Sequence, residues 1–319
     1  MVASLLACGG EGSSTTGGSS SGVGSTADIS STGETASGSP TTTSSTPTTT
    51  GGPGTTGDDG TTIVTGDSTS EGTGSTAGAS SSSSGGPNGS QCEGSALALC
   101  ESFEGAADGS FPAGWGARGD EWGEGVIGVA SDDARLGARS LKVDGGNNGQ
   151  HFMDYKGELG ELATRHFGRV FIKVAVPAPW PVDGVLHADF IEGLGPGPKG
   201  GTHNVRWGVV ENTAMAMQWI FNVQPSNGDP EFGEGTGYDY AWTGAWLCIE
   251  WFYDQPGQQG TLWIDGVELP IVPGTNHDAE IPVFTSLGVG LANYQAAGSG
   301  FTVWFDELAY DGERIGCDL

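Results

Sequence analysis

The sequence predicts an all-β domain of two stacked sheets. A hairpin pattern and a recurring period of two support this prediction, and no long segment has the period of a helix. Residues 246–267 form the clearest hairpin, because two aromatic and β-branched runs flank the turn Gln-Pro-Gly-Gln-Gln-Gly. Apolar side chains occupy both alternating rows of the first run, so both faces of this strand should be covered. Glu250 is the polar exception, and a carboxylate buried there needs a partner or a ligand.

Further segments with a period of two follow one another along the chain, separated by clusters of Gly, Pro, Asn and Asp. So many strands in one domain are expected to pack as a two-sheet jelly-roll β-sandwich. One short helical turn is expected within Glu158–His166. In chain order, the expected strands are Ala98–Phe103, Val126–Ser131, Ser140–Val143, Arg169–Val176, Val185–Glu192, Val205–Val210, Met215–Val223, Leu247–Asp254, Thr261–Ile264, Leu287–Asn293 and Phe301–Tyr310.

Composition divides the chain of 319 residues into a spacer and one folded domain. Residues 9–91 are mostly Ser, Thr and Gly, with no aromatic residue, Lys or Arg. Such a segment cannot bury enough apolar surface to offset the entropy of ordering, so we expect a long disordered N-terminal spacer. Every Trp and every basic residue falls within 92–319, which is the predicted jelly-roll domain.

Residues 1–8 are expected to be the remnant of a lipoprotein signal. The run Leu-Leu-Ala-Cys-Gly around Cys8 resembles the lipobox of bacterial lipoproteins, in which the Cys becomes lipidated. The alternative is a chance Cys in a clipped terminus, because only seven residues precede it and none is basic. The lipobox predicts a domain on the outer surface of a bacterial cell or outside it, held at the membrane only by a lipid anchor. No apolar run of about 20 residues is present to cross a bilayer.

The chain is strongly acidic, with a formal net charge of −28. This charge excludes nucleic acid as a partner, because phosphates would be repelled. It suits an exported protein and calcium ligands. We expect the domain to be a monomer.

Four cysteines in the domain predict two disulfides: Cys92, Cys100, Cys248 and Cys317. Three connectivities are open, and the sequence does not choose among them. Cys92 and Cys100 are close enough for a local clip, and Cys317 could tie down the first or last strand if these are neighbours. A zinc site is the alternative, but the spacings contain no Cys-x-x-Cys pattern.

Alternation along the middle strands leaves one face unusually rich in amides, ions and aromatic rings. A solvated sheet face normally carries Lys, Glu and Thr, whereas planar hydrogen-bonding groups and rings are typical of a sugar-binding groove. The alternative is an ordinary solvated or loop-covered face. The residues of this row are His187, Asp189, Arg206, Gln218, Asn222, Glu250 and Tyr294.

Several motifs resemble the glucuronan-lyase-like jelly-roll proteins, a group that includes fungal proteins induced alongside cellulases and many bacterial lipoproteins. The hairpin 246–266 and the ending 305–317 (Phe-Asp-Glu-Leu … Glu-Arg-Ile-Gly-Cys) carry this resemblance. The opening Leu-Cys-Glu-Ser-Phe-Glu at 99–104 and the segment 131–141 are also similar. The resemblance covers most of 92–317 and implies a concanavalin/laminin-G-like jelly roll. It implies carbohydrate-directed function less specifically.

The resemblance also implies a calcium ion clamped between the first strand, the following loop and the last strand. Its ligands here would be Glu104, the loop residues Ser131 and Asp133, and Asp306. Calcium takes six to eight oxygen ligands from carboxylates and carbonyls, which these residues supply. The alternative is that Glu104 and Asp306 are polar groups of edge strands.

A lyase of this class neutralises a uronate carboxylate, removes the proton at C5 and protonates the departing O4. The predicted catalytic residues are His187, Arg206, Gln218 and Tyr294, with His203 as a second candidate base. A locally basic groove would need Arg169 and Lys173 beside Arg206. The remaining predicted substrate-binding residues are Asp189, Asn222 and Glu250.

The predicted ligand is therefore an extracellular, uronate-containing polysaccharide that the domain binds and can cleave by β-elimination. A non-catalytic glycan-binding or adhesive surface module is the alternative. A retaining glycosidase is less favoured, because no Glu-x-Asp-x-x-Glu run places paired carboxylates along one strand.

Overall fold

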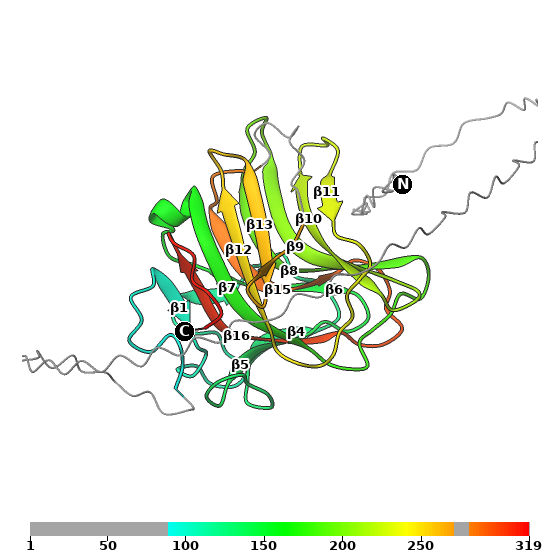
Figure 1. Ribbon diagram of the computed structural model, residues 1–319, viewed down its shortest axis with the longest axis horizontal. Coiled ribbons are helices and arrows are strands. Elements are labelled where there is room, and N and C mark those ends of the chain that lie inside the picture. The colour runs from blue at the N-terminus through cyan, green and yellow to red at the C-terminus, as the bar shows by residue number, and fades with distance from the viewer. Residues whose placement is uncertain (1–88, 271–280, 319) are drawn as a thin grey trace, which may run out of the picture. The chain divides into compact units, whose positions relative to one another are not determined.

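The computed structural model describes residues 89–270 and 281–318, and these form two antiparallel sheets of eight strands each (Figure 1). The predicted two-sheet jelly-roll β-sandwich is confirmed. Sheet A consists of β1 (Leu99–Glu101), β4 (Val126–Ala130), β5 (Ser140–Asp144), β7 (Arg165–Val174), β12 (Leu247–Asp254), β13 (Gln259–Ile264), β14 (Val267–Glu268) and β16 (Thr302–Asp311). Sheet B consists of β2 (Trp115–Ala117), β3 (Trp122–Gly123), β6 (Gly149–Tyr155), β8 (Val185–Pro196), β9 (Thr202–Asn212), β10 (Met217–Pro225), β11 (Phe232–Gly235) and β15 (Ser286–Asn293).

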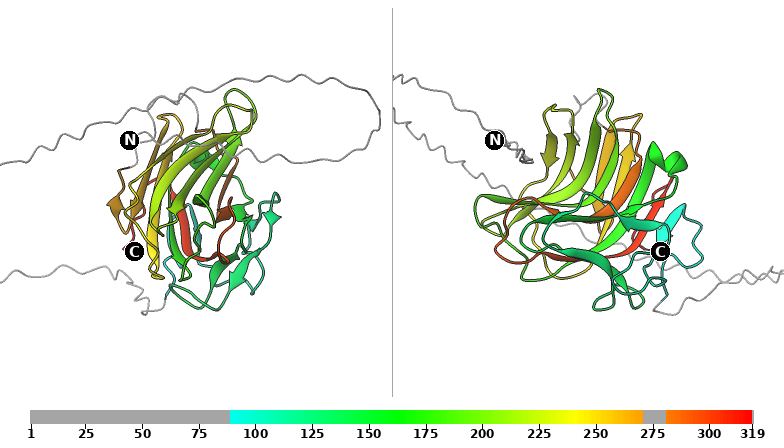
Figure 2. Two further views of the ribbon diagram at one scale, coloured as in Figure 1. Left: turned by 90° about the vertical axis from the view of Figure 1, so that its right-hand side faces the viewer. Right: turned by 180° about the vertical axis from the view of Figure 1, so that it is seen from behind.

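The chain crosses between the sheets repeatedly, so each sheet mixes strands from distant parts of the sequence (Figure 2). Sheet A runs β14-β13-β12-β7-β16-β5-β4, and β1 pairs with β16. Sheet B runs β11-β10-β9-β8-β15-β6-β2, and β3 pairs with β6. The first and last strands are therefore neighbours. The one helical element is the short 3₁₀ turn η1 (Gly160–Ala163), inside the range expected for it.

The core lies between the sheets, and the alternation of each strand decides which side chains reach it. In β12, Ile249, Trp251 and Tyr253 are fully buried in the core. Cys248 and Glu250 point to the other side of sheet A, where they are also buried. In sheet B, Trp207 belongs to the core row of β9, with Val205 and Val209 on either side of it. Each sheet thus has an inner face toward the core and an outer face away from it.

All eleven predicted strands exist, most with shifted ends, but β6 and four short strands were not predicted. β6 reads Gly-Gln-His-Phe-Met-Asp-Tyr, in which polar residues interrupt the apolar alternation. β2, β3, β11 and β14 have only two to four residues, too few to show a period. Their places are determined by pairing with longer strands.

Both predicted disulfides form, and the structure selects their connectivity. Cys92 is bonded to Cys100, and Cys248 is bonded to Cys317. The second bond holds the C-terminal segment against the outer face of β12. In the described part of the chain, no helix has the length and apolar character needed to cross a bilayer.

Candidate functional site

The outer face of sheet B collects charged and amide side chains from adjacent strands. Arg206 of β9 stands between Glu192 of β8 and Asn222 of β10 in the strand register. Two rows further along the same face, Val210 of β9 stands between His187 of β8 and Gln218 of β10. Glu192, Arg206, Asn222, His187 and Gln218 therefore share the face turned away from the core.

Arg206 is the centre of this face, and all of its contacts are with polar side chains. Its Nη1 donates to the Tyr294 hydroxyl at 2.7 Å and lies 3.0 Å from an Asp189 carboxylate oxygen. Its Nη2 donates to Asn222 Oδ1 at 2.6 Å and to Glu231 Oε1 at 2.5 Å. Burial alone would lower the pKa of Arg206, but Asp189, Tyr294 and Glu231 outweigh it and raise the pKa further. Arg206 is therefore a fixed cation.

A second guanidinium extends the same network toward β6. Arg118, from the loop after β2, donates to Asp154 at 2.9 Å and to Glu192. Its guanidinium also lies 4.3 Å from the centre of the Phe152 ring. Gly288 makes room for this pair, because a Cβ there would lie 2.1 Å from Asp154 Oδ1. The outer face of sheet B thus holds an ionic network of two arginines and four carboxylates, buried except at Glu231. We call it the sheet B cluster: Arg118, Arg206, Asp154, Asp189, Glu192 and Glu231.

Two groups at this cluster have protonation states suited to proton transfer. Burial lowers the pKa of His187, so its imidazole is neutral at pH 7. Among the described residues, its Nε2 is buried and has no hydrogen-bond partner. Burial and the nearby Asp189 raise the pKa of Tyr294 well above its usual range, so the phenol keeps its proton. The arrangement therefore pairs a free base on β8 with a proton donor that directly follows the adjacent strand β15.

Partly exposed aromatic rings lie near this cluster. Trp122 of β3 is 38% exposed, and its ring centre lies 6.2 Å from that of Tyr294. Tyr238, which follows β11, is 39% exposed and accepts a hydrogen bond from Gln218 at 3.2 Å. β3 pairs with β6, whereas β11 lies at the opposite edge of sheet B. The sequence analysis missed both rings, because neither belongs to a strand long enough to show alternation.

The structure separates three predicted substrate-binding residues from this site. Arg169, Lys173 and Glu250 lie on β7 and β12 of sheet A, so the prediction that they share a face with Arg206 is wrong. Each has a local partner. Arg169 donates to the Glu307 and Gly316 carbonyls. Lys173 pairs with Asp133 at 2.5 Å. Glu250 accepts a hydrogen bond from Arg314 at 2.8 Å and another from the Gly316 amide at 2.7 Å.

His203, the second candidate base, faces away from Arg206. It precedes Val205 by two residues on β9, so it belongs to the core row of that strand and is only 3% exposed. The expectation that it lies outside its strand is wrong, because β9 begins at Thr202. His203 is therefore not positioned as the base of this site.

The residues proposed for calcium do not fit an oxygen cage as they are arranged. Glu104 Oε1 accepts hydrogen bonds from the Ala138 and Arg139 amides at 2.8 Å each. Asp306 Oδ2 accepts from two other amides of the same loop, at 2.8 and 3.1 Å. Calcium needs oxygen atoms at these positions rather than N–H groups.

The two loop residues proposed as calcium ligands are also engaged elsewhere. Ser131 donates to Asp108 at 2.8 Å, and Asp133 pairs with Lys173. In the described part of the chain, no group of three or more His, Cys, Asp or Glu side chains is arranged to hold a metal. Cys8 and nearly all of the spacer lie outside the described residues.

Comparisons with known proteins give low similarity throughout. No family model matches the chain, and no curated protein matches it. A solved structure of a cellulose-induced protein, Cip1, is 21% identical over 69% of this chain and 99% of its own, with a TM-score of 0.48. A botulinum neurotoxin DC binding domain in complex with rat synaptotagmin II is 10% identical over 63% of this chain and 44% of its own, with a TM-score of 0.41. A Trypanosoma rangeli sialidase is 16% identical over 68% of this chain and 30% of its own, with a TM-score of 0.39.

Proposed function

We propose that the outer face of sheet B binds an extracellular polysaccharide and cleaves uronate-containing chains by β-elimination. The observation that supports this proposal is the sheet B cluster itself. The neutral imidazole of His187 and the protonated phenol of Tyr294 lie beside its buried Arg206 guanidinium, and the partly exposed Trp122 is next to Tyr294. These are the groups that the recognition and cleavage of an acidic sugar require.

Binding rests on the rings and the planar hydrogen-bonding groups. Trp122 offers a partly exposed ring next to the Tyr294 ring, and Tyr238 offers a second ring beside Gln218. Sugar rings stack on such faces while amides and guanidinium groups bind their hydroxyls. Loss of one stacking ring should weaken binding by about 1 kcal/mol.

In the proposed cleavage, Arg206, His187 and Tyr294 each have one role. Arg206 neutralises the uronate carboxylate, and the substrate takes the place of Glu231, whose side chain is 28% exposed. His187 removes the C5 proton, the released electrons form the C4–C5 double bond, and the C4–O4 bond breaks. Tyr294 gives its proton to the departing O4. The proton on His187 then returns to the tyrosine through solvent.

The test is incubation of the full chain with a panel of uronate polymers, while ultraviolet absorbance of the unsaturated product is followed. Tyr294→Phe should spare binding and remove turnover, and His187→Gln should do the same. Arg206→Ala should weaken binding and slow the reaction. Tyr155→Phe is the matched control, because this tyrosine is on the inner side of β6 and packs against the core. Wild-type rates in Tyr294→Phe and His187→Gln would exclude this mechanism.

A non-catalytic glycan-binding module is the second candidate, and the pairing of Arg206 favours it. Asp189 and Glu231 already neutralise this guanidinium, which suits a site for a neutral sugar. In that case no polymer yields an unsaturated product, Tyr294→Phe changes nothing, and Trp122→Ala still weakens binding on a glycan array. A protein that neither binds glycans nor cleaves them would be a structural or adhesive module.

The location outside the cell belongs to the same proposal. Two disulfides favour an oxidising compartment. Lipidation at Cys8 followed by the spacer 9–91 would present the domain away from the membrane. Metabolic labelling with a lipid precursor should mark the native chain and leave Cys8→Ser unlabelled, whereas equal labelling of both would exclude this anchor.

A further inference from the structure

A cavity of about 590 Å³ opens on the outer face of sheet A, opposite to the sheet B cluster. Phe171 of β7 and Glu250 of β12 contribute to it, and Trp246 stands just before β12. Arg135 reaches it from the loop between β4 and β5, and the C-terminal segment around Arg314 lines it as well. The Cys248–Cys317 disulfide holds that segment in place. The cavity is therefore built from elements fixed by the sheet and by a covalent bond.

Arg135 lines this cavity, and one N–H donor of its guanidinium has no acceptor among the described residues. Its guanidinium stacks 3.4 Å from the centre of the Phe171 ring, and Phe171 is only 3% exposed. Among the described residues, Nη1 of Arg135 is buried without a hydrogen-bond partner. An unsatisfied buried donor is costly, and a carboxylate is the acceptor that best matches a guanidinium.

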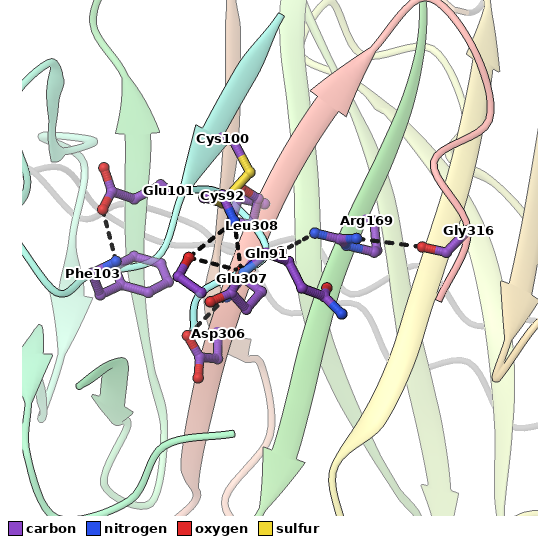
Figure 3. The surroundings of a disulfide bond; sticks show 11 residues. Gln91, Cys92, Cys100, Glu101, Phe103, Arg169, Asp306, Glu307, Leu308 and Gly316 are labelled. Carbon is purple, nitrogen blue, oxygen red and sulfur yellow. Dashed lines mark hydrogen bonds between the residues drawn. A yellow bond between two sulfur atoms is a disulfide. The ribbon is translucent and has the colours of Figure 1, made fainter. Parts of the chain in front are cut away.

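The carboxylates whose charges act on Arg135, Asp306 and Glu307, are bound by other donors. Figure 3 shows Glu307 with the Gln91 amide. Asp306 accepts the backbone amides of the Arg135 loop, and Glu307 Oε2 accepts the Gln91 amide at 2.7 Å. Glu250 is held by Arg314 at 2.8 Å. Two further acids line the cavity. Asp265 accepts the Cys248 amide at 2.9 Å, and Asp318 is exposed.

Because Glu250, Asp265 and Asp318 outnumber the cations of the lining, a bare anion does not suit the cavity. A ligand that carries one carboxylate and many hydroxyls suits the cavity better, because its hydroxyls can donate hydrogen bonds to these three acids. The half-buried Trp246 supplies a ring face for stacking. An acidic sugar has all of these features.

We propose that this cavity is a second saccharide site, in which Arg135 binds the carboxylate of an acidic sugar and Trp246 stacks on its ring. The site is independent of the proposed cleavage, because it shares no residue with the sheet B cluster. Two sites on opposite faces would let one domain hold two segments of polysaccharide, which raises avidity through effective concentration.

The test uses the Trp246 indole N–H signal in a ¹H–¹⁵N spectrum of the full chain, assigned by its loss in Trp246→Phe. D-glucuronate should shift this signal saturably, and D-glucose, which lacks the carboxylate, should bind at least about tenfold more weakly. Arg135→Gln should weaken glucuronate binding by a similar factor. Arg139→Gln is the matched control, because this arginine lies in the same loop and is 37% exposed.

Three results would overturn the proposal: no glucuronate-dependent shift at Trp246, an unchanged affinity in Arg135→Gln, or equal binding of glucose. If Arg135→Gln does not fold, Trp246→Leu replaces it, with tryptophan-independent calorimetry as the measurement. The Trp122 indole signal reports on sheet B in the same spectrum. Failure of one site is therefore distinguishable from failure of the other.

Discussion

Arg206 and Arg169 are both buried on the outer faces of their sheets, 3% and 0% exposed, yet their surroundings shift their pKa values in opposite directions. Arg206 lies against Asp189 and Glu231, and its pKa is raised. Burial lowers the pKa of Arg169 to about 10. The charge of Glu307 opposes this shift, and the charge of Arg135 adds to it. The hydrogen-bond acceptors of Arg169 are carbonyls, those of Glu307 at 3.3 Å and Gly316 at 3.4 Å (Figure 3).

Burial alone therefore does not determine the pKa of an arginine or whether its guanidinium is ion-paired. On sheet B, carboxylates neutralise the guanidinium and fix it, so a ligand must displace one of them. On sheet A, carbonyls hold Arg169 and a ring holds Arg135. The nearby Asp306 and Glu307 carboxylates bind amides instead. A guanidinium that is stacked rather than ion-paired keeps its attraction for an anion. The two faces should therefore respond differently to the same substitution.

The largest expected effect is from Arg206→Met, which removes the cation but keeps an apolar stem of similar length. Asp189 and Glu231 would then be left without their counter-ion, and Asp189 is fully buried. We expect the free energy of unfolding to fall by about 3–5 kcal/mol in urea denaturation. Lys199→Met is the control, because its pair with Asp229 is exposed and should change stability by less than about 1 kcal/mol. Equal losses in the two variants would show that the sheet B cluster is not a stabilising ion network.

The second-largest expected effect is a pH dependence of the free energy of unfolding, caused by Asp306 in β16 of sheet A. Burial raises its pKa from 3.8 to about 7, although the Leu136 and Arg135 amides lower it and Glu307 raises it. A carboxyl whose pKa is higher in the folded state contributes stability at low pH and loses it as the pH rises through about 7. Wild type should therefore lose on the order of 2 kcal/mol of unfolding free energy between pH 5 and pH 8 relative to Asp306→Asn.

Urea denaturation of both proteins across this pH range measures that difference. Asp306→Asn keeps the shape of the side chain and removes its titration, while Glu101, whose pKa is also raised, titrates in both proteins. Parallel curves would show that Asp306 is already ionised at pH 5, with the three amides dominating over burial.

Arg169→Met should cost less than Arg206→Met, although Arg169 is the more completely buried residue. Two long hydrogen bonds to carbonyls are lost, repulsion from Arg135 is relieved, and no ion pair within 4 Å is broken among the described residues. We expect a loss of about 1 kcal/mol in the same urea assay. A loss as large as that of Arg206→Met would mean that Glu307 depends on Arg169 as Asp189 depends on Arg206.

Alternation along the middle strands predicted correctly which of their side chains face away from the core, but not the sheet to which each strand belongs. Asp189, Arg206 and Asn222 come together because their strands are neighbours in sheet B. Glu250 has the same outward parity, but β12 lies in sheet A, so its carboxylate meets Arg314 instead. Sheet membership depends on long-range pairing, which a local period does not contain.

The residues missed at the site come from segments without any period. Arg118 and Glu231 lie in loops, and Trp122 lies in a strand of two residues. In the sequence, Gly288 and Gly208 are only small residues within strands. In the structure, each leaves space on the outer face for a neighbouring carboxylate. The fold was therefore predictable from its longest strands, whereas the site depends on what the loops bring to them.

The smallest expected effect is from a chelator. The resemblance implies calcium at Glu104, Ser131, Asp133 and Asp306. In the structure, backbone amides of the 131–140 loop instead donate hydrogen bonds to the Glu104 and Asp306 carboxylates. If those amides hold the loop, the unfolding temperature should be the same with and without EDTA. A lower unfolding temperature in EDTA that Asp306→Asn abolishes would instead establish the calcium ion. The loop would then exchange its amide contacts for metal ligands, and the stacking of Arg135 on Phe171 would depend on that ion, since Arg135 belongs to the same loop.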